Sequence, residues 1–232
     1  SPYYLKVAPR LPAGSEDGIA NPMTWQDVAS LGTLSLAVVP NALGPDALKD
    51  ARAAIRNAAD VYLSILRTRA YRVPVDYGKA GKAPWGSTSS LLNNLVVLGL
   101  AHDLFGGQDY LNAVAAGMDY LLGRNPLDQS YITGYGSRPL RNPHHRFWAH
   151  QANPKYPSPP PGLVSGGPNS SLQDPFAQAA GLPGCAPEKC FVDHIESWST
   201  NEIAINWNAP LAWVLAFLDE QAGGAARPSG KN

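Results

Sequence analysis

Apolar side chains recur at helical spacing along most of this chain, in segments separated by loops rich in Pro and Gly. Residues that repeat every three or four positions form one face of an amphipathic helix. The second such segment, for example, places Ile55, Tyr62 and Leu66 on one face. The pattern predicts helices over residues 28–39, 46–69, 87–104 and 108–122.

Helical periodicity disappears between residues 124 and 198, where Pro, Gly, Asn and Ser are frequent. A loop region of about 75 residues in a compact protein is usually functional. Beyond it, Ser199 and Glu202 have the spacing of a capping box, which predicts a last helix over residues 199–221. The Glu202 carboxyl is then expected in the first turn of that helix, near the loop-rich face.

The pattern predicts about five helices and no ladder of strands, so the expected fold class is all-α. Helix pairs with polar groups in the loops at one end suggest a toroid of helical hairpins. Five helices are too few to close a toroid, and their wide apolar faces need partners. We therefore expect residues 1–221 to be part of a larger domain, followed by a flexible tail at 222–232.

Composition excludes some partners. The 18 basic and 18 acidic residues give a formal net charge of zero, so there is no electrostatic reason to expect nucleic acid or an anionic membrane as a partner. No apolar run reaches the roughly 20 residues that span a bilayer.

The two cysteines, Cys185 and Cys190, are close in sequence. A small loop disulfide is the favoured interpretation, with free thiols and a zinc site that includes His194 as alternatives. A disulfide indicates an oxidising compartment, and hence a secreted protein.

Two interpretations of Glu202 stay open in the sequence. In a capping box, its side chain bonds back to the amide of the N-cap residue. The neighbouring Trp198 and Trp207, however, would raise the pKa of its carboxyl toward the range of a general acid. A helix N-terminus has the opposite effect, because it favours the carboxylate.

A short loop after a proline carries His144, His145 and Arg146, which offer hydrogen-bond donors to sugar hydroxyl groups. The alternative is that these side chains bond loop carbonyls. Adjacent side chains point apart, so we expect only one of the two histidines to face a cleft.

Trp85 and Asp193 also have two interpretations each. Trp85 lies between Pro and Gly just before a helix, where an indole can stack on a pyranose ring or fill the core. Asp193 follows two apolar residues, and its carboxylate can orient water, hold the neighbours of Glu202, bind calcium or simply be solvated.

Two long gapped motifs carry a resemblance to a known family. The first is Ser130-x-Ile132-Thr133-x2-Gly136-x-Arg138-x4-Pro143-His144-x-Arg146. The second is Phe191-x-Asp193-x4-Trp198-x3-Glu202-x-Ala204-x3-Asn208-Ala209. Both resemble the active-site signatures of glycoside hydrolase family 9, the cellulases that act as endo-β-1,4-glucanases, and the similarity extends from about residue 3 to residue 221.

The resemblance implies an (α/α)6 barrel, of which this chain supplies about half the helices and long active-site loops. It implies inverting hydrolysis of β-1,4-glucosidic bonds in cellulose or related β-glucans, without a cofactor for the chemistry. Glu202 is then the proton donor, and a structural calcium near Asp193 is a further expectation. The implied catalytic residues are Glu202, Asp193 and His144, and the implied substrate-binding residues are Arg146, His145, Trp85, Trp198 and Trp207.

One departure from the family pattern affects the whole interpretation. The family's catalytic base lies in an Asp-Ala-Gly-Asp type motif in the N-terminal half of the barrel, and this sequence has no such motif. An inverting hydrolase needs two carboxyl groups about 6.5–9.5 Å apart. We therefore expect the N-terminal half to be supplied as a separate chain, and this chain alone to be inactive. The alternatives are a non-catalytic carbohydrate-binding fragment, or the same fold acting on another β-linked glycan.

Overall fold

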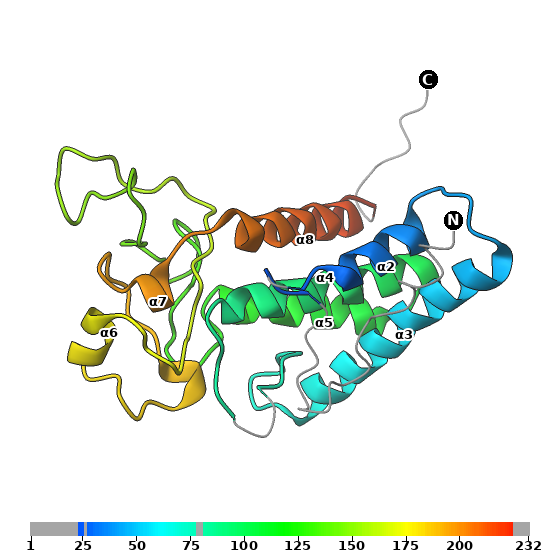
Figure 1. Ribbon diagram of the computed structural model, residues 1–232, viewed down its shortest axis with the longest axis horizontal. Helices are drawn as coiled ribbons and strands as arrows, with labels where there is room; N and C mark the ends of the chain where they lie inside the picture. The colour runs from blue at the N-terminus through cyan, green and yellow to red at the C-terminus, as the bar shows by residue number, and fades with distance from the viewer. Residues whose placement is uncertain (1–22, 26, 78–80, 225–232) are drawn as a thin grey trace.

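The computed structural model describes residues 23–25, 27–77 and 81–224, and within these ranges the regular structure is helical (Figure 1). Figure 1 shows the longer helices lying together, with the short helices and long loops at one end. The elements in chain order are α2 (Ala29–Val38), α3 (Pro45–Thr68), α4 (Ser87–Phe105), α5 (Gln108–Leu121), α6 (Pro175–Ala179), η1 (Pro187–Lys189), α7 (Trp198–Asn201) and α8 (Ile205–Gly224).

The helices predicted before residue 124 are confirmed, each end lying within one residue of its predicted position. The predicted start of the last helix is wrong. The chain forms the short α7, leaves the helical conformation at Glu202 (φ −66°, ψ 150°) and begins α8 only at Ile205. Helix α8 also extends three residues into the predicted tail, and residues 225–232 lie outside the described part of the chain.

Helix α4 lies at the centre of the helical body, where it packs against α3, α5 and α8. Its sequence has no charged residue before Asp103, which is typical of a helix without a solvent face. Every residue from 87 to 99 is buried. The hydroxyl groups of Ser87 and Thr88 donate to the carbonyl oxygens of Pro168 (2.7 Å) and Ser165 (2.5 Å), so the start of α4 is fixed to the long loops.

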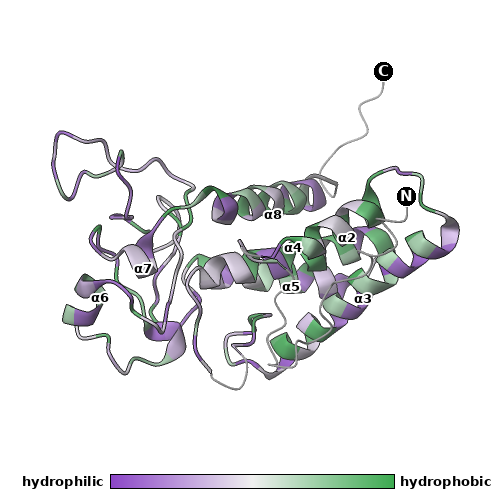
Figure 2. Cartoon of the chain, in the orientation of Figure 1, coloured by the Kyte–Doolittle hydropathy of each residue, from purple (hydrophilic) through white to green (hydrophobic). Residues whose placement is uncertain are grey.

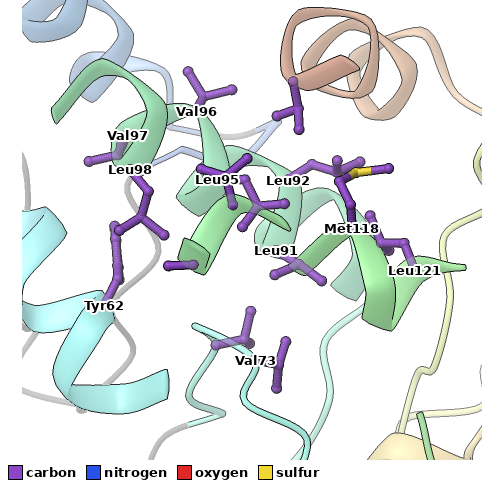
Figure 3. Close-up of a cluster of buried hydrophobic side chains, with 14 of the residues drawn as sticks. Tyr62, Val73, Leu91, Leu92, Leu95, Val96, Val97, Leu98, Met118 and Leu121 are labelled. Carbon is purple, nitrogen blue, oxygen red and sulfur yellow. The ribbon is translucent and has the colours of Figure 1, made fainter. Parts of the chain in front are cut away.

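Aliphatic side chains of α4 form the middle of the core. Figure 3 shows them meeting Met118 of α5 and Tyr62 of α3. Leu92 and Leu95 are completely buried, and burying one such side chain contributes about 1.5–3 kcal/mol. Helix α3 instead alternates between hydrophobic and hydrophilic residues along its length (Figure 2), because only one of its faces packs on this core.

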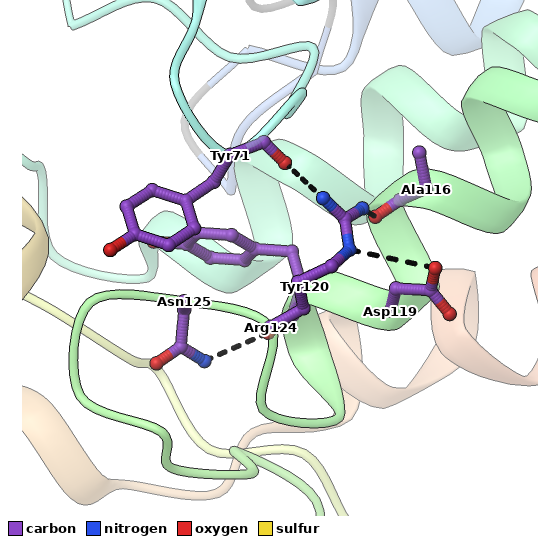
Figure 4. Close-up of polar contacts among 6 residues, drawn as sticks. All are labelled: Tyr71, Ala116, Asp119, Tyr120, Arg124 and Asn125. Carbon is purple, nitrogen blue, oxygen red and sulfur yellow. Dashed lines mark hydrogen bonds and ion pairs between the residues drawn. The ribbon is translucent and has the colours of Figure 1, made fainter.

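Just after α5, Arg124 fastens the start of the long loop region to the helices (Figure 4). Its guanidinium donates to the carbonyl oxygens of Tyr71 and Ala116, both at 2.6 Å. Its Nε also lies 3.5 Å from the Oδ2 atom of Asp119. Next to it, the Asn125 side chain donates to the carbonyl oxygen of Tyr120 at 2.8 Å. These contacts fix the direction in which the chain leaves the helical body.

The predicted loop region is held by backbone hydrogen bonds between segments distant in sequence. The Tyr131 N–H donates to the Leu121 carbonyl at 2.9 Å, and isolated bridges pair Ile132 with Val164 and Ser165 with Ile203. The short helices α6 and η1 were not predicted, because three to five residues carry no periodic signal. In the part of the chain that the structure describes, no helix combines the length and apolarity that crossing a bilayer requires.

The contact between α4 and α5 gives a testable prediction about stability. A Cβ atom at Gly117 would lie 2.5 Å from Leu95 Cδ2, whereas one at Gly32 in α2 would meet nothing within 4 Å. Gly117→Ala should therefore overpack the core and lower the free energy of unfolding by about 1–2 kcal/mol. The matched change Gly32→Ala should raise it by about 0.5–1 kcal/mol, because Ala favours the helix. Chemical denaturation of both variants measures the difference, and equal effects would contradict this account of the packing.

Candidate active site

Glu202 lies in an extended segment between α7 and α8, held by backbone hydrogen bonds to two loops. The His144 N–H donates to the Asn201 carbonyl at 2.8 Å, and the Gly166 N–H donates to the Glu202 carbonyl at 3.0 Å. Residues 144 and 202 thus pair as an isolated parallel bridge. The predicted capping box is wrong, since Ser199 lies inside α7 and Glu202 follows its last residue.

The environment of the Glu202 carboxyl decides between the two effects left open by the sequence. The side chain is half-buried, and burial raises the pKa of Glu202 above its ordinary value. The nearby His144 and a hydrogen bond from the Trp85 indole lower this pKa, but burial has the larger effect. Glu202 is not in the first turn of a helix, so the expected bond of its side chain to an N-cap amide is not formed. A carboxyl with a raised pKa suits proton donation near neutral pH.

The two adjacent histidines have different surroundings. His144 Nδ1 lies 2.5 Å from the Ile195 carbonyl, which can only accept, so this nitrogen carries the proton and a neutral ring presents Nε2 as an acceptor. His145 Nδ1 instead accepts the N–H groups of Phe147 (3.1 Å) and Trp148 (3.2 Å). Its ring stacks on Trp148, and burial together with His144 lowers the pKa of His145. His145 thus closes its own turn, and its contact with substrate stays a prediction.

Arg146 follows on the same loop with an exposed side chain. It makes no hydrogen bond or ion pair with the rest of the described chain, so its guanidinium is available to a ligand. Five donors in a planar group suit the hydroxyl groups of a polysaccharide.

Asp193 joins the loop that carries His144 to the segment that carries Glu202. Its carboxylate accepts the N–H groups of Arg141 and Asn142, both at 2.8 Å, and the side-chain N–H of Asn201 at 3.1 Å. The carboxylate therefore holds the two segments in place, and any direct contact of Asp193 with substrate stays a prediction.

The surroundings of Asp193 do not fit a calcium ion. N–H donors approach both of its oxygens, whereas calcium needs six to eight oxygen ligands. Across the described residues, no group of three or more His, Cys, Asp or Glu side chains is placed to hold a metal ion.

Two of the three tryptophans expected at the site lie together beside Glu202. The rings of Trp85 and Trp198 are 5.3 Å apart at 41°, and Trp85 is 40% exposed. The expectation for Trp207 is corrected, since this side chain is only 6% exposed and belongs to the core. Its ring packs closely against Gly86 and Gly166, where an added Cβ atom would lie only about 3 Å from the ring. Trp207 therefore leaves no face for a sugar.

The cysteines form the predicted disulfide between Cys185 and Cys190, which sets aside the free-thiol and zinc interpretations. The bond closes the loop around η1. Cys190 is fully buried, and its carbonyl accepts the Asn169 N–H at 2.9 Å. The disulfide thus anchors the chain just before the segment of Asp193 and Glu202.

Asp174 is a buried carboxylate that sequence reasoning missed. It is the N-cap of α6, where its Oδ1 accepts the Ala177 N–H at 2.6 Å. Asp followed by Pro175 is a recognisable start of a helix, so this bond was predictable. Its second set of partners, on Ser197 and Ser199, gives no local signal.

The site thus combines a half-buried carboxyl of raised pKa, a pair of indole rings and an exposed arginine, an arrangement suited to carbohydrates. The sequence profile of glycosyl hydrolase family 9 matches residues 3–215. The chain belongs to this family.

Two relatives with high identity are named a cellulose cellobiosidase and an endoglucanase. The chain is 47% identical over 227 residues to a cellulose 1,4-beta-cellobiosidase of Acetivibrio thermocellus, covering 95% of this chain and 25% of the relative. It is 44% identical over 207 residues to endoglucanase C of Cellulomonas fimi, covering 88% of this chain and 18% of the relative. The chain therefore spans a quarter or less of the length of these relatives.

The fold is that of the family's (α/α)6 barrel enzymes. A single-mutant thermostable endoglucanase from Alicyclobacillus acidocaldarius superimposes with a TM-score of 0.76 at 31% identity. The match covers 93% of this chain but 38% of that structure. The expected fold class is thereby confirmed.

The raised pKa of Glu202 predicts how stability depends on pH. A carboxyl whose pKa is raised on folding stabilises the protein at pH values below its ordinary pKa, and this contribution is lost as pH rises through the raised value. Gln at this position stays neutral at every pH. Glu202→Gln should therefore gain stability relative to the parent as pH rises from about 4 to 7. Thermal unfolding across this range measures the effect, and a gain on acidification instead would contradict it.

Proposed function

We propose that this chain contributes the proton-donating half of an inverting glycosidase that hydrolyses internal β-1,4-glucosidic bonds in cellulose or related β-glucans. The observation that carries the proposal is the half-buried Glu202, whose pKa is raised by burial beside Trp85 and Trp198. The names of the two relatives, a cellulose 1,4-beta-cellobiosidase and an endoglucanase, support the choice of substrate.

In the proposed reaction, Glu202 in its acid form gives a proton to the departing glycosidic oxygen. A water molecule attacks the anomeric carbon from the opposite face, and a second carboxylate takes a proton from that water. Trp85 and Trp198 offer ring faces to the sugar, Arg146 binds hydroxyl groups, and His144 Nε2 accepts a hydrogen bond. The oxidising compartment that the disulfide requires supports a secreted enzyme.

We infer that the water-activating carboxylate belongs to polypeptide outside these 232 residues. Asp193, the carboxylate tied to the Glu202 segment, already accepts three N–H donors. The same inference is supported by the fact that this chain covers only 25% and 18% of the lengths of the two relatives. A groove of about 440 Å³ between α2, α4 and α8 supports it too. Its walls include the apolar side chains of Trp25, Val28 and Trp213, and such a surface is typical of one that further polypeptide covers.

Glu202→Gln tests the proton donor in a preparation that contains this chain and the rest of the catalytic domain. Turnover of cellohexaose should fall by about 10²–10⁴-fold, because the leaving oxygen is no longer protonated. Dinitrophenyl β-cellobioside needs no such proton, so its hydrolysis should fall far less. Proton NMR of the first products should show the α-anomer, as inversion requires.

The matched control is Glu196→Gln, the same change at an exposed carboxyl in the loop just before α7, which should keep parental turnover. Parental turnover of cellohexaose by Glu202→Gln would refute the assigned donor. Intact-mass analysis tests the missing base, and full activity from the 24.7 kDa chain alone would refute that part. Binding of glucan without any turnover would favour a non-catalytic binding fragment, and turnover of other β-linked glycans alone would favour a different specificity.

A further inference from the structure

The Asp174 carboxylate is completely buried and takes all of its described hydrogen bonds from two short helices. Oδ1 accepts the Ala177 N–H of α6. Oδ2 accepts the Ser199 N–H (3.1 Å), the Ser197 hydroxyl (3.2 Å) and a short hydrogen bond from the Ser199 hydroxyl. No Lys or Arg forms an ion pair with it within the described ranges, so these donors stabilise its buried charge.

These bonds fix the first residues of α7. Ser197 is the N-cap of α7 but makes no side-chain cap bond, and its hydroxyl instead lies against Asp174 and 2.7 Å from Thr200 Oγ1. The Asn169 side chain holds the Ser199 carbonyl at 2.8 Å. Helix α7 is only four residues long, so an anchor at its start also sets the position of the residue that follows its end.

That next residue is Glu202. Its backbone is held on the other side by His144 and Gly166. The segment is therefore held at the start of α7 by Asp174, at its end by Asp193 through Asn201, and after it by the backbone pairing; of the two carboxylates, only Asp174 is completely buried. Because α7 is too short to be stable alone, loss of the Asp174 charge weakens three of the hydrogen bonds that hold its first turn, and Asn169 alone does not fix its direction.

We propose that Asp174 is a positioning residue for the proton donor: through Ser197 and Ser199 it orients α7 so that the Glu202 carboxyl lies beside Trp85 and reaches the leaving oxygen. This inference rests on the proposed function of Glu202. A misplacement of about 1 Å in a catalytic group can cost about 100-fold in rate. Asp174 itself touches neither substrate nor reacting atoms in this scheme.

The test is Asp174→Asn in the preparation that contains this chain and the rest of the catalytic domain. Asn keeps the size of the side chain but presents N–H groups to donors on α7. We expect kcat for cellohexaose to fall by about 10–100-fold, with KM within about threefold of the parent. Hydrolysis of dinitrophenyl β-cellobioside, which needs no proton donor, should stay within about threefold.

The pH profile gives a second readout that a purely structural defect would not change in this way. A Glu202 carboxyl that moves away from its apolar wall regains solvent, so its pKa falls toward the ordinary value. The proton donor must be protonated to act, so the alkaline limb of the kcat profile should move to lower pH. His144 is the other titratable group that acts on Glu202, and its ring bond to Ile195 does not involve Asp174.

The matched control is Asp60→Asn, which changes a carboxylate that accepts the Tyr110 hydroxyl at 2.6 Å between α3 and α5. It should keep parental kinetics on both substrates. Ser199→Ala removes one donor to Asp174 without exposing a buried charge, and should show the same selective loss to a smaller extent. This variant keeps the test decisive if Asp174→Asn does not fold.

The outcomes distinguish a failure of the positioning role of Asp174 from a failure of the proposed role of Glu202. Equal losses on both substrates, or parental kinetics in Asp174→Asn, would refute the positioning role while Glu202→Gln still identifies the donor. If Glu202→Gln keeps full turnover of cellohexaose, the proposed function fails and the positioning role fails with it. A selective loss on cellohexaose together with the shifted alkaline limb supports the positioning role.

Discussion

The backbone pairing between residues 144 and 202 is the interaction on which the active face depends. It brings the loop after Pro143 against the segment between α7 and α8, although the two are almost 60 residues apart in the chain. The pairing also explains why Glu202 is not helical, because its backbone extends to meet the partner loop. A carboxyl inside a regular helix would not have this neighbour, and burial beside Trp85 would not raise its pKa in the same way.

Two aspartates support this pairing from different sides, and neither forms an ion pair with a described residue. Asp193 holds the loop at Arg141 and Asn142 next to Asn201, while Asp174 holds the start of α7. Carboxylates suit this task because each oxygen can accept more than one hydrogen bond, and bonds to a charged acceptor are stronger than neutral ones. The disulfide fixes the chain between them, so the segment from residue 185 to residue 202 is held at several points.

Sequence patterns predicted α3 and α5 well because their apolar residues repeat on one face, whereas α4 was predicted because it is a long, mostly apolar segment between loops rich in Pro and Gly. They predicted the importance of Glu202 but not its conformation: Ser199 and Glu202 match a capping box, yet Ser199 bonds Asp174 instead. A contact from outside the segment overrode the local pattern. The prediction for Trp207 failed for a related reason. It rested on closeness to Glu202 in the sequence, but the absence of side chains at Gly86 and Gly166 lets the Trp207 ring enter the core.

We propose one origin for two features, the exposed edge of the helical body at α8 and a proton donor that needs a second carboxylate as its partner. Helix α4 has neighbours on several sides, whereas among the described helices α8 packs chiefly against α4. Ile205, at the start of α8 and three residues after Glu202, is 90% exposed. An apolar side chain that exposed at the start of a long apolar helix is typical of a surface that another part of a domain covers. Under the proposed function, the polypeptide that covers α8 also faces the segment of Glu202, where inverting hydrolysis needs a second carboxylate.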